Sequence, residues 1–157
     1  MKQIIINGID TGVELERYPE QLPTEQKVCV FEQHLGFQLP DDYRVFLLKY
    51  NGGTCKFGSV IEPLDSVLCD LYCFDTHGQY GCMPLKLPKD CEEWEGLPRN
   101  ILLIGETDSG GAVGILFEEG TTAIVVIDHE MDFSQEQIIM RSPSFTQFLV
   151  DLVRNED

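Results

Sequence analysis

The sequence predicts an α+β domain in which a mostly antiparallel sheet packs against an N-terminal helix pair and a C-terminal helix. Helical patterns follow one another at 24–36 and 40–53, and a third lies at 142–152. Between them, short apolar runs alternate with turn residues, which is typical of strands joined by hairpins. The chain has 157 residues, of which 43% are hydrophobic, so it is long enough for one core. We therefore expect a single domain over residues 1–157.

The first elements are a short strand and a helix. An apolar run at Gln3 to Ile6 predicts the strand. Thr24 is a good N-cap for a helix of about eleven residues, and Gly36 suits its end because glycine accepts a positive φ. The inward face of this helix has apolar residues at helical spacing, namely Val28, Phe31 and Leu35.

A second helix is predicted from Asp41 to Asn51. Pro40 suits its first position, and the carboxylates of Asp41 and Asp42 lie at the positive end of the helix dipole. The glycine pair that follows ends the helix and permits a sharp turn. The buried face is formed by the aromatic and aliphatic residues at i, i+3, i+4 and i+7, which are Tyr43, Phe46, Leu47 and Tyr50.

The middle of the chain predicts two strands and a long excursion. Apolar, β-rich runs at 55–61 and 67–74 are separated by a turn-like cluster at 62–66. Residues 75–99 are rich in glycine, proline and charge, and their prolines break any regular element. We therefore expect an exposed excursion there, and we regard it as the candidate specificity segment.

The C-terminal part predicts three strands and a closing helix. The strands lie at 102–104, 113–118 and 123–128, and the last two are joined as a hairpin through residues 119–121. Ser142 is the expected N-cap of the helix, with a proline in its first turn. The buried face again has i, i+3, i+4 and i+7 spacing, with Phe145, Phe148, Leu149 and Leu152.

Several of these segments resemble the SUKH superfamily, the Smi/Knr-like proteins. The Leu-Pro opening and the Asn-Gly-Gly ending of the second helix, at 39–40 and 51–53, are similar to the family signature. Residues 104–116 and 125–130 resemble its central strands, and 144–149 resembles its closing helix. The resemblance implies a protein-binding domain of one of two kinds. These are bacterial immunity proteins that neutralise a toxin domain, often a nuclease, and eukaryotic regulators of cell-wall synthesis.

The charge of the chain limits its partners. Eleven Lys and Arg against 27 Asp and Glu give a formal net charge of −16. A direct nucleic-acid partner is not expected, because such binding requires a basic surface that neutralises phosphates. A basic protein partner fits better, although net charge also serves simply to keep a protein soluble. No signal-peptide core or membrane span is recognisable, so we expect a cytoplasmic protein.

The six cysteines raise the question of disulfides or a metal site. Without an export signal, reduced thiols are expected. No Cys-x-x-Cys pair occurs, and Cys69, Leu71 and Cys73 have the period-two spacing of one buried strand face. We therefore expect no metal or other cofactor. A metal or small-molecule sensor remains an alternative, and its candidate ligands are Cys69, Cys73, His77, Cys82 and Cys91.

The remaining residues contain no recognisable catalytic motif. The segment 105–110 has two glycines at the spacing of a phosphate loop, but Gly111 and Ala112 replace the required Lys and Ser/Thr. The simpler interpretation is a tight connection between strands, with polar side chains exposed at a contact surface. Ser109 lacks the glycine pattern of a nucleophile elbow. We therefore expect no enzymatic activity.

Acidic and polar residues provide the candidate partner-binding set. One acidic run flanks Trp94, the sole tryptophan, and an aromatic anchor ringed by charge is typical of a binding hot spot, although Trp94 suits a core position equally well. The full set is Asp90, Glu92, Glu93, Trp94, Glu95, Thr107, Asp108, Ser109, Glu118, Glu119, Asp128 and Glu130.

These observations favour the first of the two family classes, an immunity protein that occludes a cognate toxin domain. The chain reads as one compact domain without the long disordered extensions expected of the regulatory class. Its acidic surface suits a basic nuclease. The alternative from the same family is a regulator of cell-wall synthesis. We expect a monomer or weak dimer.

Overall fold

The computed structural model describes residues 1–73, 100–128 and 138–154. Its helices are α1 (Glu25–Leu35), α2 (Asp41–Lys49) and α3 (Phe145–Val150), with a 3₁₀ turn at Glu62–Leu64. Its strands are β1 (Lys2–Ile6), β2 (Ile9–Arg17), β3 (Gly53–Cys55), β4 (Ser59–Ile61), β5 (Ser66–Leu71), β6 (Ile101–Thr107), β7 (Ala112–Glu118), β8 (Thr121–Ile127), β9 (Ile138–Ser142) and β10 (Val153–Arg154).

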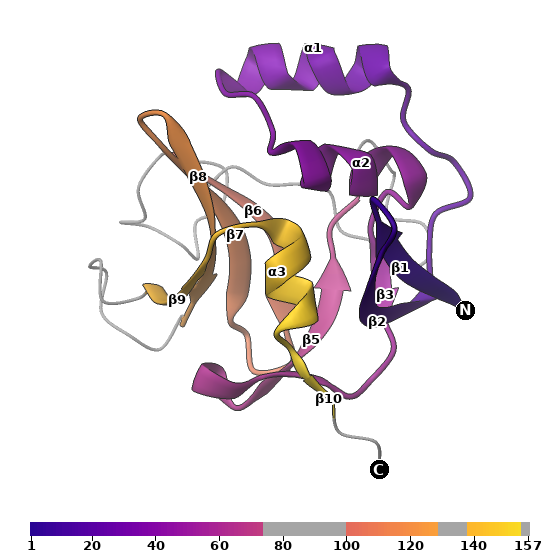
Figure 1. Cartoon of the computed structure of the whole chain (residues 1–157), viewed down its shortest axis with the longest axis vertical. Helices are drawn as coiled ribbons and strands as arrows, with labels where there is room; N and C mark the ends of the chain where they lie inside the picture. The colour runs from indigo at the N-terminus through magenta and orange to yellow at the C-terminus, as the bar shows by residue number, and fades with distance from the viewer. Residues whose placement is uncertain (74–99, 129–137, 155–157) are drawn as a thin grey trace.

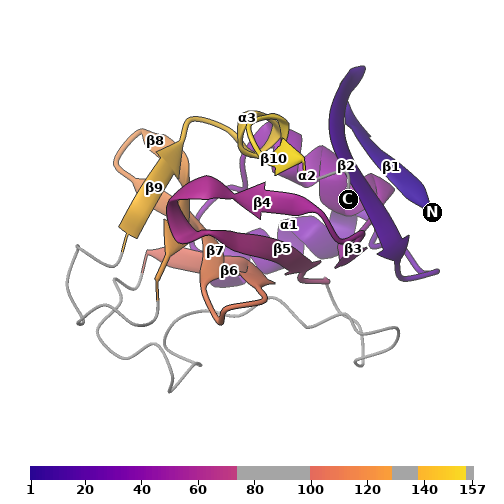
Figure 2. The same ribbon diagram turned by 90° about the horizontal axis from the view of Figure 1, so that it is seen from below.

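All strand pairings in the described residues are antiparallel. The sheet follows the order β1-β2-β3-β5-β6-β7-β8-β9, and β4 lies off this path between β5 and β10. Figure 1 shows α3 lying across one face of the sheet, and Figure 2 shows β4 running alongside β5. The α+β class, the antiparallel sheet and the positions of the three helices are thus as the sequence predicts.

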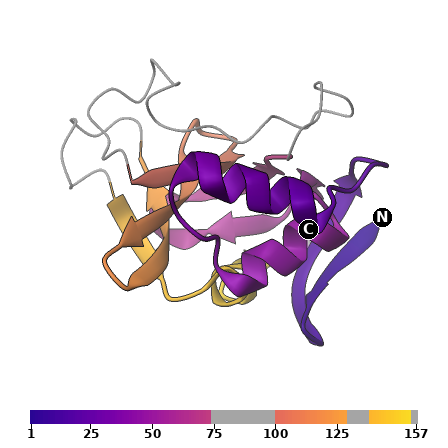
Figure 3. The ribbon, with the colours of Figure 1, turned by 90° about the horizontal axis from the view of Figure 1, so that it is seen from above.

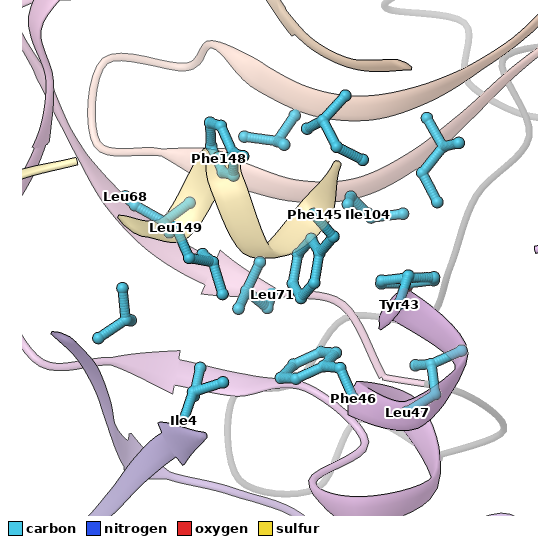
Figure 4. Packing of buried hydrophobic residues seen from close by; sticks show 14 of the residues in the cluster. Ile4, Tyr43, Phe46, Leu47, Leu68, Leu71, Ile104, Phe145, Phe148 and Leu149 are labelled. Atoms are coloured by element: carbon cyan, nitrogen blue, oxygen red, sulfur yellow. The ribbon is translucent and has the colours of Figure 1, made fainter. Parts of the chain in front are cut away.

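The main core lies between the sheet and helices α2 and α3. Phe46 of α2 packs against Phe145 of α3 with ring centroids 5.0 Å apart, and Tyr43 meets the same Phe145 ring at 5.1 Å (Figure 4). The predicted apolar faces of both helices are buried here. Helix α1 lies outside α2, as seen from above in Figure 3, and buries only Val28 fully.

A side chain in the first turn of α2 ties it to α3. The backbone N–H and the hydroxyl of Thr146 both donate to Asp42 Oδ2, at 2.7 and 2.8 Å. The carboxylate therefore satisfies a donor at the start of α3, where backbone N–H groups have no partner within the helix. The acidic start of α2 thus joins two helices that are 104 residues apart in the chain.

The glycine pair after α2 is required by close backbone contacts. Gly52 has φ +81°, and a Cβ built there meets the carbonyl oxygen of Tyr72 at 2.5 Å. Gly53 has φ +143°, and its Cβ meets the carbonyl oxygen of Arg17 at 2.4 Å. The missing side chains therefore allow the chain leaving the helix to enter the sheet between β2 and β5.

Some predicted boundaries are wrong. Ser142 ends β9, and the N-cap of α3 is Ser144, whose hydroxyl accepts from Gln147 N. Helix α2 ends at Lys49 rather than Asn51, because Asn51 adopts φ +57°. Strands β2 and β9 were not predicted from the sequence at all.

The expected period-two face of β5 is also interrupted. A register shift lies between Leu68 and Asp70, where β5 pairs with β6. Leu68 and Leu71 are both buried, whereas Cys69 is half-buried. An extra residue in a strand changes which side chains face the core, so Cys69 does not share one uninterrupted buried row with Leu71 and Cys73.

Candidate partner-binding surface

The β7–β8 hairpin separates the predicted site residues into two groups. Glu118 and Glu119 lie at its turn, because Glu118 pairs with Thr121. Asp128 follows Ile127, which pairs with Ala112 at the other end of the hairpin. Six strand steps from Ala112 to Glu118 place these ends about 20 Å apart.

The second group consists of Asp128 and the β6–β7 turn with Thr107, Asp108 and Ser109. The remaining members of the predicted set, Asp90, Glu92, Glu93, Trp94, Glu95 and Glu130, lie outside the described residues.

The connection between β6 and β7 is a tight turn. Thr107 N donates to the Gly111 carbonyl oxygen at 3.0 Å, and Gly111 N donates back to Thr107 Oγ1 at 3.0 Å. Thr107 is only 5% exposed, so its hydroxyl belongs to the internal structure of the turn. The predicted tight interstrand connection is therefore confirmed.

Asp108 joins this turn to the start of β5. Ser66 Oγ donates to Asp108 Oδ1 at 2.6 Å, and Val67 N donates to the same oxygen at 2.9 Å. The Ser66 hydrogen bond, followed by that of Val67, lowers the pKa of the Asp108 carboxyl because both favour its charged form. The hydroxyls of Ser66 and Ser109 are also 2.8 Å apart. Asp108 and Ser109 are exposed residues, but these contacts hold their polar atoms in place.

Acidic residues surround Cys69 beside this turn. Burial, together with the negative charges of Asp108, Asp70 and Glu106, raises the pKa of the Cys69 thiol to about 11. Asp70 accepts a hydrogen bond from Thr54 Oγ1 at 2.9 Å. The thiol therefore stays protonated at neutral pH, a state that is a poor nucleophile and a poor metal ligand.

The cysteines differ in state. Cys73 is disulfide-bonded, so the expectation of reduced thiols is wrong at this position. Cys29, Cys55 and Cys69 are reduced thiols, as expected. A bonded Cys73 has no thiolate to offer a metal. His77, Cys82 and Cys91 lie outside the described residues. In residues 1–73, 100–128 and 138–154, no three potential ligands are grouped to hold a metal ion.

An open groove lies beside the other group of predicted residues. It has a volume of about 590 Å³ and runs between the α1–α2 connection and the β7–β8 turn. We call it the Phe37 groove, and its walls are residues Phe37, Gln38, Leu39, Pro40, Asp41, Phe117, Glu118, Gly120, Thr121 and Thr122. Figures 1 and 3 show the hairpin turn next to the chain that leaves α1.

An aromatic pair joins the two sides of the Phe37 groove. The rings of Phe37 and Phe117 are stacked, with centroids 4.7 Å apart and planes inclined by 14°. Phe117 is buried, but Phe37 remains 40% exposed. Phe37 is not among the site residues that the sequence predicts. The available signal was a large apolar residue directly after Gly36, the glycine that ends α1.

Carboxylates lie around the groove. Arg141 Nη1 contacts Glu118 Oε1 at 2.9 Å, and both side chains are about half exposed. Asp41 lies in the first turn of α2, and Glu119 lies between two wall residues at the exposed hairpin turn. The groove thus combines an exposed aromatic surface with negative charge that Arg141 offsets only in part.

Comparison with known proteins identifies the fold family. The family model described as SUKH_6, SMI1-KNR4 cell-wall, matches residues 25–149. The chain belongs to the SUKH family. This stretch of the SUKH chain begins at the first residue of α1 and ends within α3, so it spans both sides of the Phe37 groove.

A curated relative extends the similarity to most of the SUKH chain. It is the SPbeta prophage-derived uncharacterized protein YokK of Bacillus subtilis (strain 168), which is 28% identical over 160 residues. The match covers 92% of this chain and 80% of the relative. In the described residues, none of the helices has the length and apolar character needed to cross a membrane.

Proposed function

We propose that this SUKH-family chain is an immunity protein that binds a cognate bacterial toxin domain and blocks its active site by occlusion. The observation that carries the proposal is the family match over residues 25–149 in a chain of net charge −16. In this proposal the protein acts in the cytoplasm, as a monomer or weak dimer, and it works through binding without catalytic turnover.

Charge supports a basic toxin, such as a nuclease whose substrate groove is positive. Negative charge on the immunity protein speeds the encounter with such a surface and disfavours partners of the same sign. The exposed carboxylates Glu118 and Glu119 at the β7–β8 turn, and the half-buried carboxylate Asp128 at the far end of the hairpin, contribute to this steering. Occlusion then requires only that the bound immunity protein cover the substrate groove of the toxin.

The test begins with the neighbouring coding sequence, where we expect a large secreted protein that ends in a toxin domain. Co-expression of that domain with this chain should restore growth of cells that the toxin otherwise kills. An immunity protein from an unrelated toxin pair serves as the control. Growth arrest that this chain fails to relieve, together with no binding at micromolar concentrations, would refute the proposal.

The salt dependence of association tests the electrostatic part. Surface plasmon resonance should give an association rate that falls steeply as ionic strength rises, because screening shortens the range of charge attraction. The dissociation rate should change much less. An association rate that does not respond to ionic strength would refute steering even if binding is tight.

The second candidate is a regulator of cell-wall synthesis, and the family description SMI1-KNR4 cell-wall favours it. Such a regulator also acts through protein contacts, so binding alone does not distinguish the two. Deletion of the gene in its host does. An immunity role predicts loss of viability only when the toxin is present, whereas a cell-wall role predicts altered sensitivity to wall-active compounds without any toxin.

A further inference from the structure

We propose that the Phe37 groove receives an arginine side chain of the partner protein, with its guanidinium stacked on Phe37 and paired with the neighbouring carboxylates. This inference rests on the proposed function, and it specifies a contact site and the chemistry of its occupant. It adds Phe37 and Asp41 to the acidic residues that the sequence predicts.

The aromatic surface is already fixed in position. One face of the Phe37 ring packs on Phe117 at a centroid distance of 4.7 Å, and Phe117 itself is buried in the main core. Phe37 nevertheless keeps 40% of its surface exposed. A guanidinium that stacks on this ring gains a cation–π contact without first ordering a mobile side chain.

The charges beside the Phe37 ring favour a positively charged occupant. Asp41 and Glu119 are exposed, whereas Glu118 is paired with Arg141 at the rim. Arg44 of α2 contacts Glu25 and Glu32 of α1 and hydrogen-bonds to Cys29 Sγ, so its charge is already engaged in the α1–α2 packing. The balance at the groove is negative, which favours a cation and disfavours a phosphate or carboxylate.

The same charge argues against a second copy of this chain. Two molecules of formal charge −16 repel each other, and a carboxylate-rimmed groove offers no compensating cation to an acidic partner. Arginine fits better than lysine because its planar guanidinium stacks on a ring and still directs N–H donors at carboxylates in the same plane.

The groove also has room for the chain that carries the arginine. A second hollow is lined by Cys29, Glu32, Gln33 and Gly36 and shares Phe37 and Gln38 with the Phe37 groove. Phe37 therefore lies between two adjoining depressions. A partner segment that crosses them would place its arginine at Phe37 and its neighbouring residues along α1.

The first experiment is an NMR titration of the full chain with a blocked Gly-Arg-Gly tripeptide. We expect saturable shifts of backbone amides in the groove, a weaker response to Gly-Lys-Gly, and no specific response to Gly-Glu-Gly. Phe37→Leu keeps an apolar side chain but removes the π face, and it should weaken arginine binding about threefold. Asp41→Asn combined with Glu119→Gln should weaken it by a similar factor.

Matched variants separate a site from diffuse attraction. Phe57 is 72% exposed on the β3–β4 turn, so Phe57→Leu is the aromatic control, and Glu16→Gln on β2 is the charge control. Both should leave tripeptide binding unchanged. Equal losses in control and groove variants, or equal binding of the arginine and glutamate peptides, would overturn the inference. Preserved spectra elsewhere will show that each variant is folded.

Measurements with the toxin domain separate this inference from the proposed function. Tight binding of the toxin by both the wild type and Phe37→Leu, with the same dissociation constant, refutes the groove and leaves the immunity role standing. Failure of the wild type to bind the toxin refutes the proposed function. A dissociation rate that rises at least threefold in Phe37→Leu supports both.

Discussion

Replacing Phe46 with alanine removes a ring from the centre of the helix–sheet core. Phe46 has no exposed surface. Its ring lies 5.0 Å from Phe145, 5.8 Å from Tyr50 and 6.0 Å from Tyr43, measured between centroids. Tyr43 lies in α2, Tyr50 directly follows that helix, and Phe145 lies in α3, the helix that Asp42 joins to α2. The cavity left by the substitution would therefore be lined by three aromatic rings.

The expected loss of stability follows from these contacts. Burying a phenylalanine side chain is worth roughly 2–3 kcal/mol, and each aromatic pair adds about 0.5–1.5 kcal/mol. Incomplete relaxation around the cavity places Phe→Ala substitutions at roughly 3–5 kcal/mol. With a urea m-value of about 2 kcal/mol/M, the midpoint of unfolding should fall by about 2 M. Phe148→Ala, in the face of α3, should have a comparable effect.

Urea denaturation followed by circular dichroism measures this difference. Phe57→Ala is the control, because it makes the same chemical change at a residue that is 72% exposed. The control should change the free energy of unfolding by less than about 0.5 kcal/mol. A loss below about 1 kcal/mol in Phe46→Ala would refute the reasoning, since it would mean that the ring is not packed in the core.

Three further substitutions test other features of the fold. Gly52→Ala and Gly8→Ala both place alanine at φ +81°, but of these two glycines only Gly52 has backbone atoms within 4 Å of the added Cβ. In urea denaturation, Gly52→Ala should therefore lose roughly 1–3 kcal/mol more unfolding free energy than Gly8→Ala. Equal losses in the two variants would contradict the close approach. Among the described residues, the hydroxyl of Tyr43 is buried without a hydrogen-bond partner, and burial also raises its pKa. Tyr43→Phe should therefore keep or increase stability, by up to about 1 kcal/mol, and a clear loss in thermal melts would reveal an unseen partner. The lowered pKa of Asp108 stabilises the fold above the ordinary carboxyl pKa, and this contribution is lost as pH falls through the folded value. The difference in unfolding free energy between wild type and Ser66→Ala should thus shrink as the pH falls from about 5 to about 2. An NMR titration should show a higher Asp108 pKa in the variant than in the wild type. A difference in stability that does not depend on pH would argue against the linkage.

The sequence predicted well those elements whose limits are set by nearby residues. Thr24 and Gly36 bound α1 as expected, because Thr24 Oγ1 accepts from Lys27 N and Gly36 adopts φ +83°. The hairpin turn at 119–120 was recognisable because Gly120 supplies a positive φ there. Such signals depend on a few consecutive residues, so they can be interpreted without the rest of the fold.

Boundaries that depend on pairing were less accessible. Ser142 and Ser144 are both good N-caps, and the choice between them is made by β8, whose Ile124 pairs with Ser142 and draws it into β9. Strand β2 buries Thr11 together with Val13 and Leu15, and a polar residue on the inward side hid its alternation. In β5, the register shift against β6 changes the phase of the side chains.

The sequence by itself determined the fold class, the helix faces, the acidic charge and the resemblance to the SUKH family. Tertiary structure alone decided which polar residues are exposed for a partner. It engaged Asp108 with Ser66, placed Glu118 about 20 Å from Asp128, and stacked Phe37 on Phe117, which lies 80 positions later in the chain. Contacts of this kind arise from the pairing order of the strands, and that order is fixed by burial summed over the whole sheet rather than by any local pattern.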